Sequence, residues 1–282
     1  MVLVCFLPVR DHWLGPDVDA AAAALGELSA RAKDYSADPA YEERLALWHL
    51  ALGQFRRAEE IHRRLIEEVP RRWPEKSPEV GLAWSALAHG DLPTARAAMR
   101  RLFARSDGAH GDFWTIVVYA RAGLVKAARL ALKAPPPTGW TPGETSLAAG
   151  EIAVAEGRLA EAAGSFRQAL EQLSPRAERA HRALAMQSLS QVLERQGHRS
   201  AALAALDEAA ADRRDSAVRG GIRGLYVDVW LDIQARRAAL LRALGRAPEA
   251  EPIEAELKTF LARADPDHPI LLQLGQVTPT RH

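Results

Sequence analysis

Asparagine is absent from this sequence, cysteine occurs once, and only five of the 37 basic residues are lysine. The single cysteine, Cys5, excludes an internal disulfide and indicates a reducing compartment or indifference to redox conditions. The missing asparagine removes the residue that would hold a metal in a phosphotransferase catalytic loop, which the HGDL sequence at 89–92 superficially resembles. Gly90 in that sequence is also a candidate turn residue between two helices. We therefore predict no phosphotransfer site there.

Neither sign of charge dominates, since 37 basic and 36 acidic residues leave a formal net charge of +1. A chain with this balance has no overall attraction to nucleic acid or to an acidic membrane. Long hydrophobic runs are also lacking: residues 2–7 are apolar, but a helix that spans a bilayer needs about 20 such residues. This run has no basic flank before it and no small-residue cleavage site soon after it, so a signal peptide is not expected. We expect a cytoplasmic protein with no membrane partner.

Motifs for metal or cofactor binding are missing as well. The nine histidines form no HExxH pattern and have no cysteine partners, so no metal site is indicated. Gly220, Gly221 and Gly224 lie near two arginines, but their spacing fits neither the dinucleotide fingerprint nor the phosphate-binding loop. A basic loop between helices is the simpler interpretation. We predict no catalytic residue, no metal and no cofactor.

What the sequence does contain is a helix–turn–helix pattern between Thr141 and Pro175. Thr141 is a candidate N-cap, Pro142 suits the first helical position, and Glu144 completes the spacing of a capping box. Gly157 ends the first helix, because glycine tolerates the left-handed conformation of a C-terminal turn. The second helix carries one apolar face at three- and four-residue spacing, formed by Ala162, Ala163, Phe166, Ala169, Leu170 and Leu173.

Small residues in this stretch favour a close crossing of its two helices. Gly150, Ala162 and Ala169 have little or no side chain, and Phe166 could fill the gap that remains between them. This arrangement of small and aromatic residues resembles the tetratricopeptide repeat, a helix–turn–helix unit of about 34 residues. A single unit cannot bury its apolar face alone, so the resemblance implies an array of stacked neighbours.

A glycine followed five positions later by an alanine recurs six times along the chain. The pairs are Gly53/Ala58, Gly90/Ala95, Gly123/Ala128, Gly157/Ala162, Gly197/Ala202 and Gly245/Ala250. Successive glycines are 37, 33, 34, 40 and 48 residues apart, so only the last interval is much longer than the repeat. The third unit departs from the pattern at Ile116, which is large for a close crossing, and at Pro135, which shortens its second helix. We expect irregular stacking around the third and sixth units.

These repeats predict an all-α fold, a right-handed superhelical solenoid of about six tetratricopeptide-like units that covers about residues 39–264. Three prolines between the third and fourth units favour a stiff, extended connector. The expected division is a lead-in segment with an N-terminal capping helix at 1–38, units 1–3 at 39–134, the proline-rich connector at 135–142, units 4–6 at 143–264, and a C-terminal tail or cap at 265–282.

In the family that this sequence resembles, the first helices of successive repeats line a concave groove. Gln187, Gln191 and Arg195 are four residues apart and form one helical stripe on that face. Such a surface could hold a peptide or an acidic tail through charge-assisted hydrogen bonds. The register set by the glycines and alanines predicts these groove residues: Arg44, Trp84, Phe113, Arg121, Glu151, Gln187, Gln191, Arg195, Asp232, Arg236 and Arg242.

The resemblance implies a non-enzymatic scaffold or sensor that binds a protein or peptide segment. The long C-terminal helices resemble repeat arrays attached to bacterial signalling kinases and transcription regulators, which implies a section of a larger bacterial regulator and leaves a homo-oligomer open. One alternative is an all-α hydrolase or transferase without a recognisable motif. Another is a nucleic-acid-binding regulator that uses the basic loop at 213–223, although the near-neutral charge argues against it.

Overall fold

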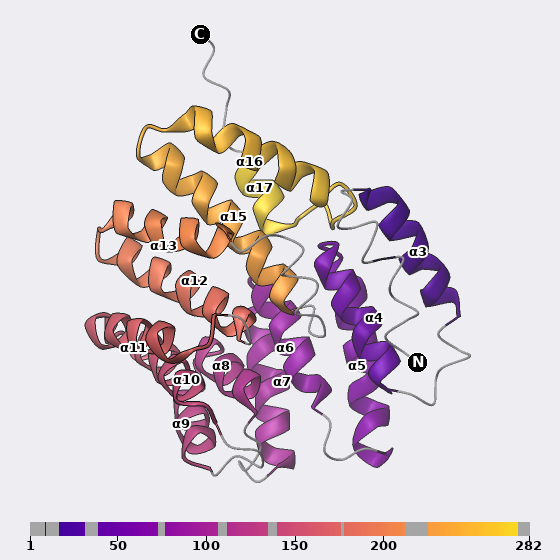
Figure 1. Cartoon of the computed structure of the whole chain (residues 1–282). Helices are drawn as coiled ribbons and strands as arrows, with labels where there is room; N and C mark the ends of the chain where they lie inside the picture. The colour runs from indigo at the N-terminus through magenta and orange to yellow at the C-terminus, as the bar shows by residue number, and fades with distance from the viewer. Residues whose placement is uncertain are drawn as a thin grey trace.

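A computed structural model describes Val9 and residues 17–31, 39–72, 77–106, 112–134, 140–175, 178–211 and 225–275. These residues form helices joined by turns, with no strand among them, as the predicted all-α fold requires (Figure 1). The helix α3 (Val18–Ala30) precedes the repeats, and α17 (Pro269–Gly275) follows them. The two-helix units are α4 (Pro39–Ala51) with α5 (Phe55–Arg72), α6 (Pro78–Ala88) with α7 (Leu92–Arg105), α8 (Phe113–Arg121) with α9 (Val125–Lys133), α10 (Pro142–Ala155) with α11 (Leu159–Gln172), α12 (Arg179–Arg195) with α13 (Arg199–Ala211), and α15 (Leu225–Ala243) with α16 (Ala247–Phe260).

The turn inside each two-helix unit contains one glycine in the left-handed region. The residue after this glycine donates its N–H to the carbonyl five positions back, as from Gln54 to His49 at 2.8 Å. This bond satisfies a free carbonyl in the last turn of the first helix and needs a positive φ at the residue before the donor. The glycines, with φ between 71° and 89°, are those identified from the sequence: Gly53, Gly90, Gly123, Gly157, Gly197 and Gly245.

The central unit has the predicted capping box and close crossing. The Thr141 hydroxyl accepts from the Glu144 N–H at 3.2 Å, and a Glu144 carboxylate oxygen accepts from the Thr141 N–H at 2.9 Å. Gly150 of α10 faces the ring of Phe166 on α11 so closely that an added Cβ would overlap it. Phe166 is fully buried, so its ring cannot move aside.

The third unit is short, and the prolines that follow it predict this for its second helix. Its two helices, α8 and α9, have nine residues each, and α9 ends at Lys133, before the proline-rich connector. Residues 135–139 of that connector lie outside the described residues, and Pro142 is already the first residue of α10. Ile116, the large residue at the crossing position, is fully buried.

The first helices of the units form an inner layer and the second helices an outer layer. All eight residues from Phe113 to Ala120 of the inner helix α8 are buried, because neighbouring helices cover it on several sides. In the outer helix α7 only one stripe is buried, formed by Ala95, Ala98, Met99 and Leu102. A helix that is apolar on most faces is expected in the interior, whereas an amphipathic helix lies at the surface.

The array of units closes on itself. Each inner helix contacts the next one along the series α4, α6, α8, α10, α12 and α15, and α15 also contacts α4. The turn between α16 and α17 meets the first unit, where the Asp265 N–H donates to the Gly53 carbonyl at 3.1 Å. The last and first units therefore lie side by side, and the inner helices surround a common centre (Figure 1).

Two helical glycines provide a matched test of the crossing in the central unit. We expect Gly150→Ala to lower the free energy of unfolding by about 1–3 kcal/mol, because the new methyl group overlaps the buried Phe166 ring. Gly164→Ala, in the neighbouring helix α11, meets no atom within 4 Å and should raise it by up to ~1 kcal/mol through helix propensity. Urea unfolding followed by circular dichroism measures both, and equal effects would contradict the crossing.

Candidate functional site

Polar and aromatic side chains from five inner helices meet at the centre of the ring. We call this set the inner cluster. It contains charged groups of both signs, two residues that both donate and accept hydrogen bonds, and one tryptophan. Its members are Trp84 of α6, Arg121 of α8, Glu151 of α10, Gln187 and Ser188 of α12, and Asp228, Asp232 and Arg236 of α15.

Arg121 is the hub of the inner cluster. Its guanidinium donates two hydrogen bonds to the Glu151 carboxylate, at 2.9 and 3.1 Å, and further ones to the Ser188 hydroxyl at 3.2 Å and the Gln187 side-chain carbonyl at 3.4 Å. Its Cζ atom lies 5.4 Å from the centre of the Trp84 ring. Bidentate pairing and an aromatic face both suit a planar guanidinium. One side chain thus contacts residues of three other units.

The guanidinium group of Arg121 keeps its positive charge although the side chain is mostly buried. Its side chain is 23% exposed and that of Glu151 is 5% exposed. Burial acts to lower the pKa of Arg121, but the charge and hydrogen bonds of Glu151 outweigh it, so the pKa is raised. Removal of Glu151 would leave an unpaired charge in a poorly solvated place, which costs more than the pair contributes.

Two further contacts reach the last unit, one from across the ring and one from the neighbouring unit. The Trp84 indole N–H donates to Asp228 Oδ2 at 3.0 Å, although 144 residues separate the two in sequence. The Gln187 amide donates to Asp232 Oδ2 at 2.5 Å, and Arg236 Nε donates to the same oxygen at 2.7 Å. The second and fifth units are in this way bonded to the sixth.

Asp228 has an unusual protonation state for a carboxyl group. Burial, followed by the charge of Asp232 one helical turn away, raises the pKa of Asp228 to about 7. The Trp84 hydrogen bond and the Arg121 charge act in the opposite direction and are weaker. The Asp228 carboxyl is therefore a proton donor near neutral pH, which carboxyl groups at protein surfaces are not.

Six of the predicted groove residues lie in the inner cluster, namely Trp84, Arg121, Glu151, Gln187, Asp232 and Arg236. The sequence analysis missed Ser188 and Asp228, and the second could have been found because it precedes Asp232 by one helical turn.

The other five predicted groove residues lie elsewhere. Phe113 packs at 4.5 Å against the His181 ring and Arg242 donates to both oxygens of Glu254 on α16. Arg44 is partly buried, with its pKa lowered mainly by burial. Gln191 is half-buried, and Arg195 is exposed at the end of α12.

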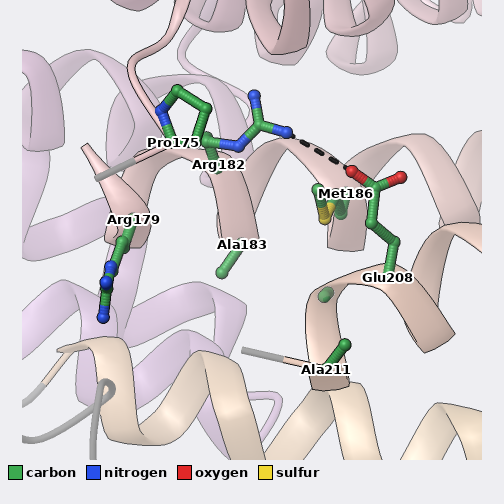
Figure 2. Close-up of a pocket in the computed structure, with 8 residues that line it drawn as sticks. Pro175, Arg179, Arg182, Ala183, Met186, Glu208 and Ala211 are labelled. Carbon is green, nitrogen blue, oxygen red and sulfur yellow. Dashed lines mark hydrogen bonds and ion pairs between the residues drawn. The ribbon is translucent and has the colours of Figure 1, made fainter. Parts of the chain in front are cut away.

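A cleft of about 240 Å³ lies between α12 and α13. Figure 2 shows that Arg182 crosses it to reach Glu208, with Nη2 and Oε1 3.3 Å apart. Arg182 also donates to the Leu173 carbonyl at 3.3 Å, at the end of α11. The chain continues from both lips of this cleft, after Pro175 and after Ala211, into residues outside the described part. We therefore do not assign a ligand to it.

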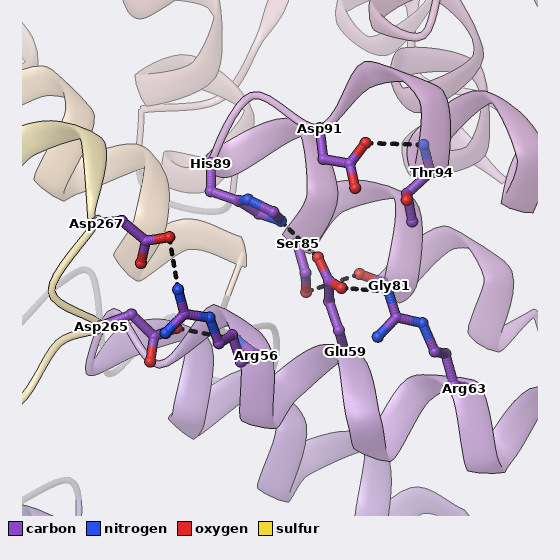
Figure 3. A network of polar contacts seen from close by, with 10 residues as sticks. All are labelled: Arg56, Glu59, Arg63, Gly81, Ser85, His89, Asp91, Thr94, Asp265 and Asp267. Carbon is purple, nitrogen blue, oxygen red and sulfur yellow. Dashed lines mark hydrogen bonds and ion pairs between the residues drawn. The ribbon is translucent and has the colours of Figure 1, made fainter.

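The HGDL sequence is the turn between α6 and α7 (Figure 3). His89 Nε2 lies 2.5 Å from a carboxylate oxygen of Glu59, which also pairs with Arg63 at 2.5 Å. Asp91 caps α7 by accepting from the Thr94 N–H at 3.1 Å. Gly90 has the positive φ of the turn. Every polar residue of this sequence thus has a structural partner.

One group of metal-ligating side chains comes together among the described residues. Glu144, Glu178 and His181 place one ligand atom each within 4.8 Å of one another. The Thr141 hydroxyl donates to Glu178 at 2.9 Å, the Ser174 N–H donates to its other oxygen at 2.8 Å, and Glu144 belongs to the capping box. These hydrogen bonds account for the positions of both carboxylates without an ion.

No protein-family model matches the sequence, and no curated protein matches it either. Several solved structures, in contrast, are similar to this chain. A tetratricopeptide repeat protein from Parabacteroides merdae is similar over 97% of each chain, with a TM-score of 0.53 and 11% identity. TTC0263, a thermophilic tetratricopeptide repeat protein of Thermus thermophilus, is 19% identical over 84% of this chain and 97% of its own, with a TM-score of 0.43. The Cut9–Hcn1 structure matches 94% of this chain and 48% of its own, with 13% identity and a TM-score of 0.44.

The similarity to the Parabacteroides merdae protein and the six glycine turns define the fold class: the chain is an all-α array with the fold of tetratricopeptide repeat proteins. Within the described residues, no helix is both long and apolar enough to cross a membrane.

The raised pKa of Asp228 predicts a pH-dependent stability. The native carboxyl keeps its proton up to a pH of about 7, whereas in the unfolded chain it loses the proton near 4. Its contribution to the free energy of unfolding is therefore present below pH 4 and decreases as the pH rises to 7, by at most ~1.4 kcal/mol per pH unit. We expect Asp228→Asn to lack this component.

Unfolding of both proteins between pH 4.5 and 8 measures the difference. His62 and His268, whose pKa values burial lowers to about 4, destabilise the fold as the pH falls, but they do so in both proteins. The gap between the two stability curves isolates Asp228, and parallel curves would refute its raised pKa.

Proposed function

We propose that this protein is a non-enzymatic interaction module that binds a peptide or protein segment on the inner face of its repeat array. The supporting observation is the convergence of Trp84, Arg121 and Asp232 from separate units, since a partner lying along this face touches several units at once. Large shared surfaces of this type are how repeat arrays bind extended segments. A role as a section of a bacterial regulatory system, suggested by the family resemblance, is part of the proposal.

The partner segment carries an acidic group in this proposal. Arg236 and Asp232 are 35% and 34% exposed, so both are open to solvent at the edge of the inner cluster. Arg195 is exposed, and within the described part of the chain no residue forms an ion pair with it. Gln191 lies one turn before Arg195 on the same stripe. Guanidinium groups bind carboxylates through two parallel hydrogen bonds, which favours an acidic peptide over a neutral one.

The arginines of the predicted groove are not equivalent in this proposal. Arg242 donates from Nε and Nη2 to the two carboxylate oxygens of Glu254, so its substitution would disturb the seam between α15 and α16 as well as any binding. Arg195 and Arg236 are the informative positions. A nucleic-acid-binding role would depend on Arg213, Arg214, Arg219 and Arg223, which lie outside the described residues.

The binding proposal predicts a specific loss of affinity. Once affinity purification and mass spectrometry have identified a partner segment, Arg195→Ala with Arg236→Ala should weaken its binding by tenfold or more, because a hydrogen bond to a charged group contributes about 1.5–3 kcal/mol. Titration of the labelled peptide by fluorescence anisotropy measures this. Arg167→Ala, at an exposed site of the outer helix α11, is the control and should change affinity less than about twofold. Equal affinity for all three proteins would remove the inner face from the proposal.

An enzymatic function is a second candidate, favoured by the carboxyl pair on α15. A carboxyl with a pKa of about 7 next to a second carboxyl is the arrangement that acid–base hydrolysis uses. Asp228 would supply the proton and Asp232 would act as the base. A hydrolase and transferase screen of the purified chain tests this candidate. Turnover that Asp228→Asn abolishes at unchanged stability would favour it over the interaction module, and absence of turnover in the wild type would end it.

A further inference from the structure

The turn between α16 and α17 docks on the first unit through its backbone. We call this turn, residues 261–268, the corner. The Asp265 N–H donates to the Gly53 carbonyl at 3.1 Å, and the Gln54 side chain donates to the Arg263 carbonyl at 3.1 Å. In return, Asp265 Oδ2 accepts from the Arg56 N–H at 3.0 Å. These bonds join residues more than 200 positions apart. The corner therefore binds the backbone of the first unit directly, at the Gly53 carbonyl and the Arg56 N–H.

Two ion pairs surround this docking site. Arg56 Nη2 lies 2.7 Å from Asp267 Oδ2, and Arg263 Nε lies 2.6 Å from Asp19 Oδ1 on α3 (Figure 3 shows the first pair). All four side chains are more than half exposed, between 56% and 70%. Exposed pairs contribute little to stability and are screened by salt. The edge of the contact is therefore polar and sensitive to ionic strength.

A stacked pair of rings fills the middle of the contact. His268, only 3% exposed, lies parallel to the Phe55 ring at 4.7 Å. Gly53 makes this approach possible, because a Cβ there would lie 2.6 Å from the Ala264 Cβ and 2.7 Å from the His268 ring. The equivalent turn glycines Gly90, Gly157, Gly197 and Gly245 have no atom within 4 Å of such a Cβ. The first turn thus differs from four equivalent turns by accepting a segment against it.

The closure differs from the seams between successive units. At three of those seams the second helix of one unit packs extensively against the first helix of the next: α5 on α6, α11 on α12 and α13 on α15. Within the described residues, α16 forms no comparable packing with α4. The corner contacts the first unit there instead. Helix–helix packing buries a continuous apolar stripe, whereas the corner offers one ring stack and a set of polar contacts. The closure therefore depends on the corner together with the contact of α15 on α4.

We propose that the corner is a releasable latch that holds the array as a closed ring, and that its release opens the ring into a superhelix. When the corner leaves the first unit, α15 separates from α4, and the bond between Trp84 and Asp228 breaks. The inner cluster then faces solvent along an open groove. The use of that groove by a partner rests on the proposed function, whereas the opening itself does not.

Distance measurements by electron paramagnetic resonance test the latch without any partner. Spin labels at Glu60→Cys on α5 and Lys258→Cys on α16, both exposed positions, report the separation of the first and last units in a Cys5→Ser background. The unaltered closure should give one short distance. Gly53→Ala should add a longer distance, with the open population raised about tenfold or more, since its methyl group overlaps the corner.

Gly157→Ala is the matched control, because it has the same left-handed strain and no neighbour. It should keep the single short distance.

The exposed Arg56 provides a second test. Arg56→Glu places a negative charge next to Asp265 and Asp267, so the repulsion should open the ring. Asp267→Arg, added to Arg56→Glu, restores an ion pair and should close the ring again. A short distance retained in both Gly53→Ala and Arg56→Glu, or equal opening in Gly157→Ala, would overturn the latch. Failure of peptide binding in a protein shown to open would instead count against the proposed function.

Discussion

The structure depends on apolar stripes that two-helix units can bury only against one another. Phe166 shows this locally, since its ring lies in the space that Gly150 leaves on the neighbouring helix. The same requirement acts between units, because each second helix packs on the first helix of the next unit. An array of this kind has an uncovered face at each end. Here the two ends meet, through the contact of α15 with α4 and through the corner.

Closure has a chemical consequence at the centre. Inner helices that would line an open groove come near one another, so their polar side chains must find partners inside the protein. Arg121 shows how this is met, with one carboxylate, one hydroxyl and one amide around its guanidinium. The arrangement leaves Asp228 with less solvation than a carboxylate requires, and its pKa rises as a result. The polar groups at the centre therefore have specific partners, and their burial costs free energy. Functional sites usually combine these two features.

The local features of the fold could be predicted from the sequence, because they depend on residues a few positions apart. Glycines in the turns, the capping box at Thr141 and the short third unit are of this type. The register of the first helices also brought Arg121 and Gln187 to one face. The closure could not be predicted, since the contact of Gly53 with Asp265 joins distant residues through backbone atoms that carry no sequence signal. Asp228 could have been found from its position one helical turn before Asp232, but its bond to Trp84, four units away, could not.

Small-angle X-ray scattering of the purified chain tests most directly whether neighbouring units support one another around a complete ring. A compact chain of 282 residues has a radius of gyration of about 19 Å. A closed ring predicts a value close to this figure and a distribution of interatomic distances with a single peak. A clearly larger radius with an extended tail at long distances, the signature of an open superhelix, would contradict the closure.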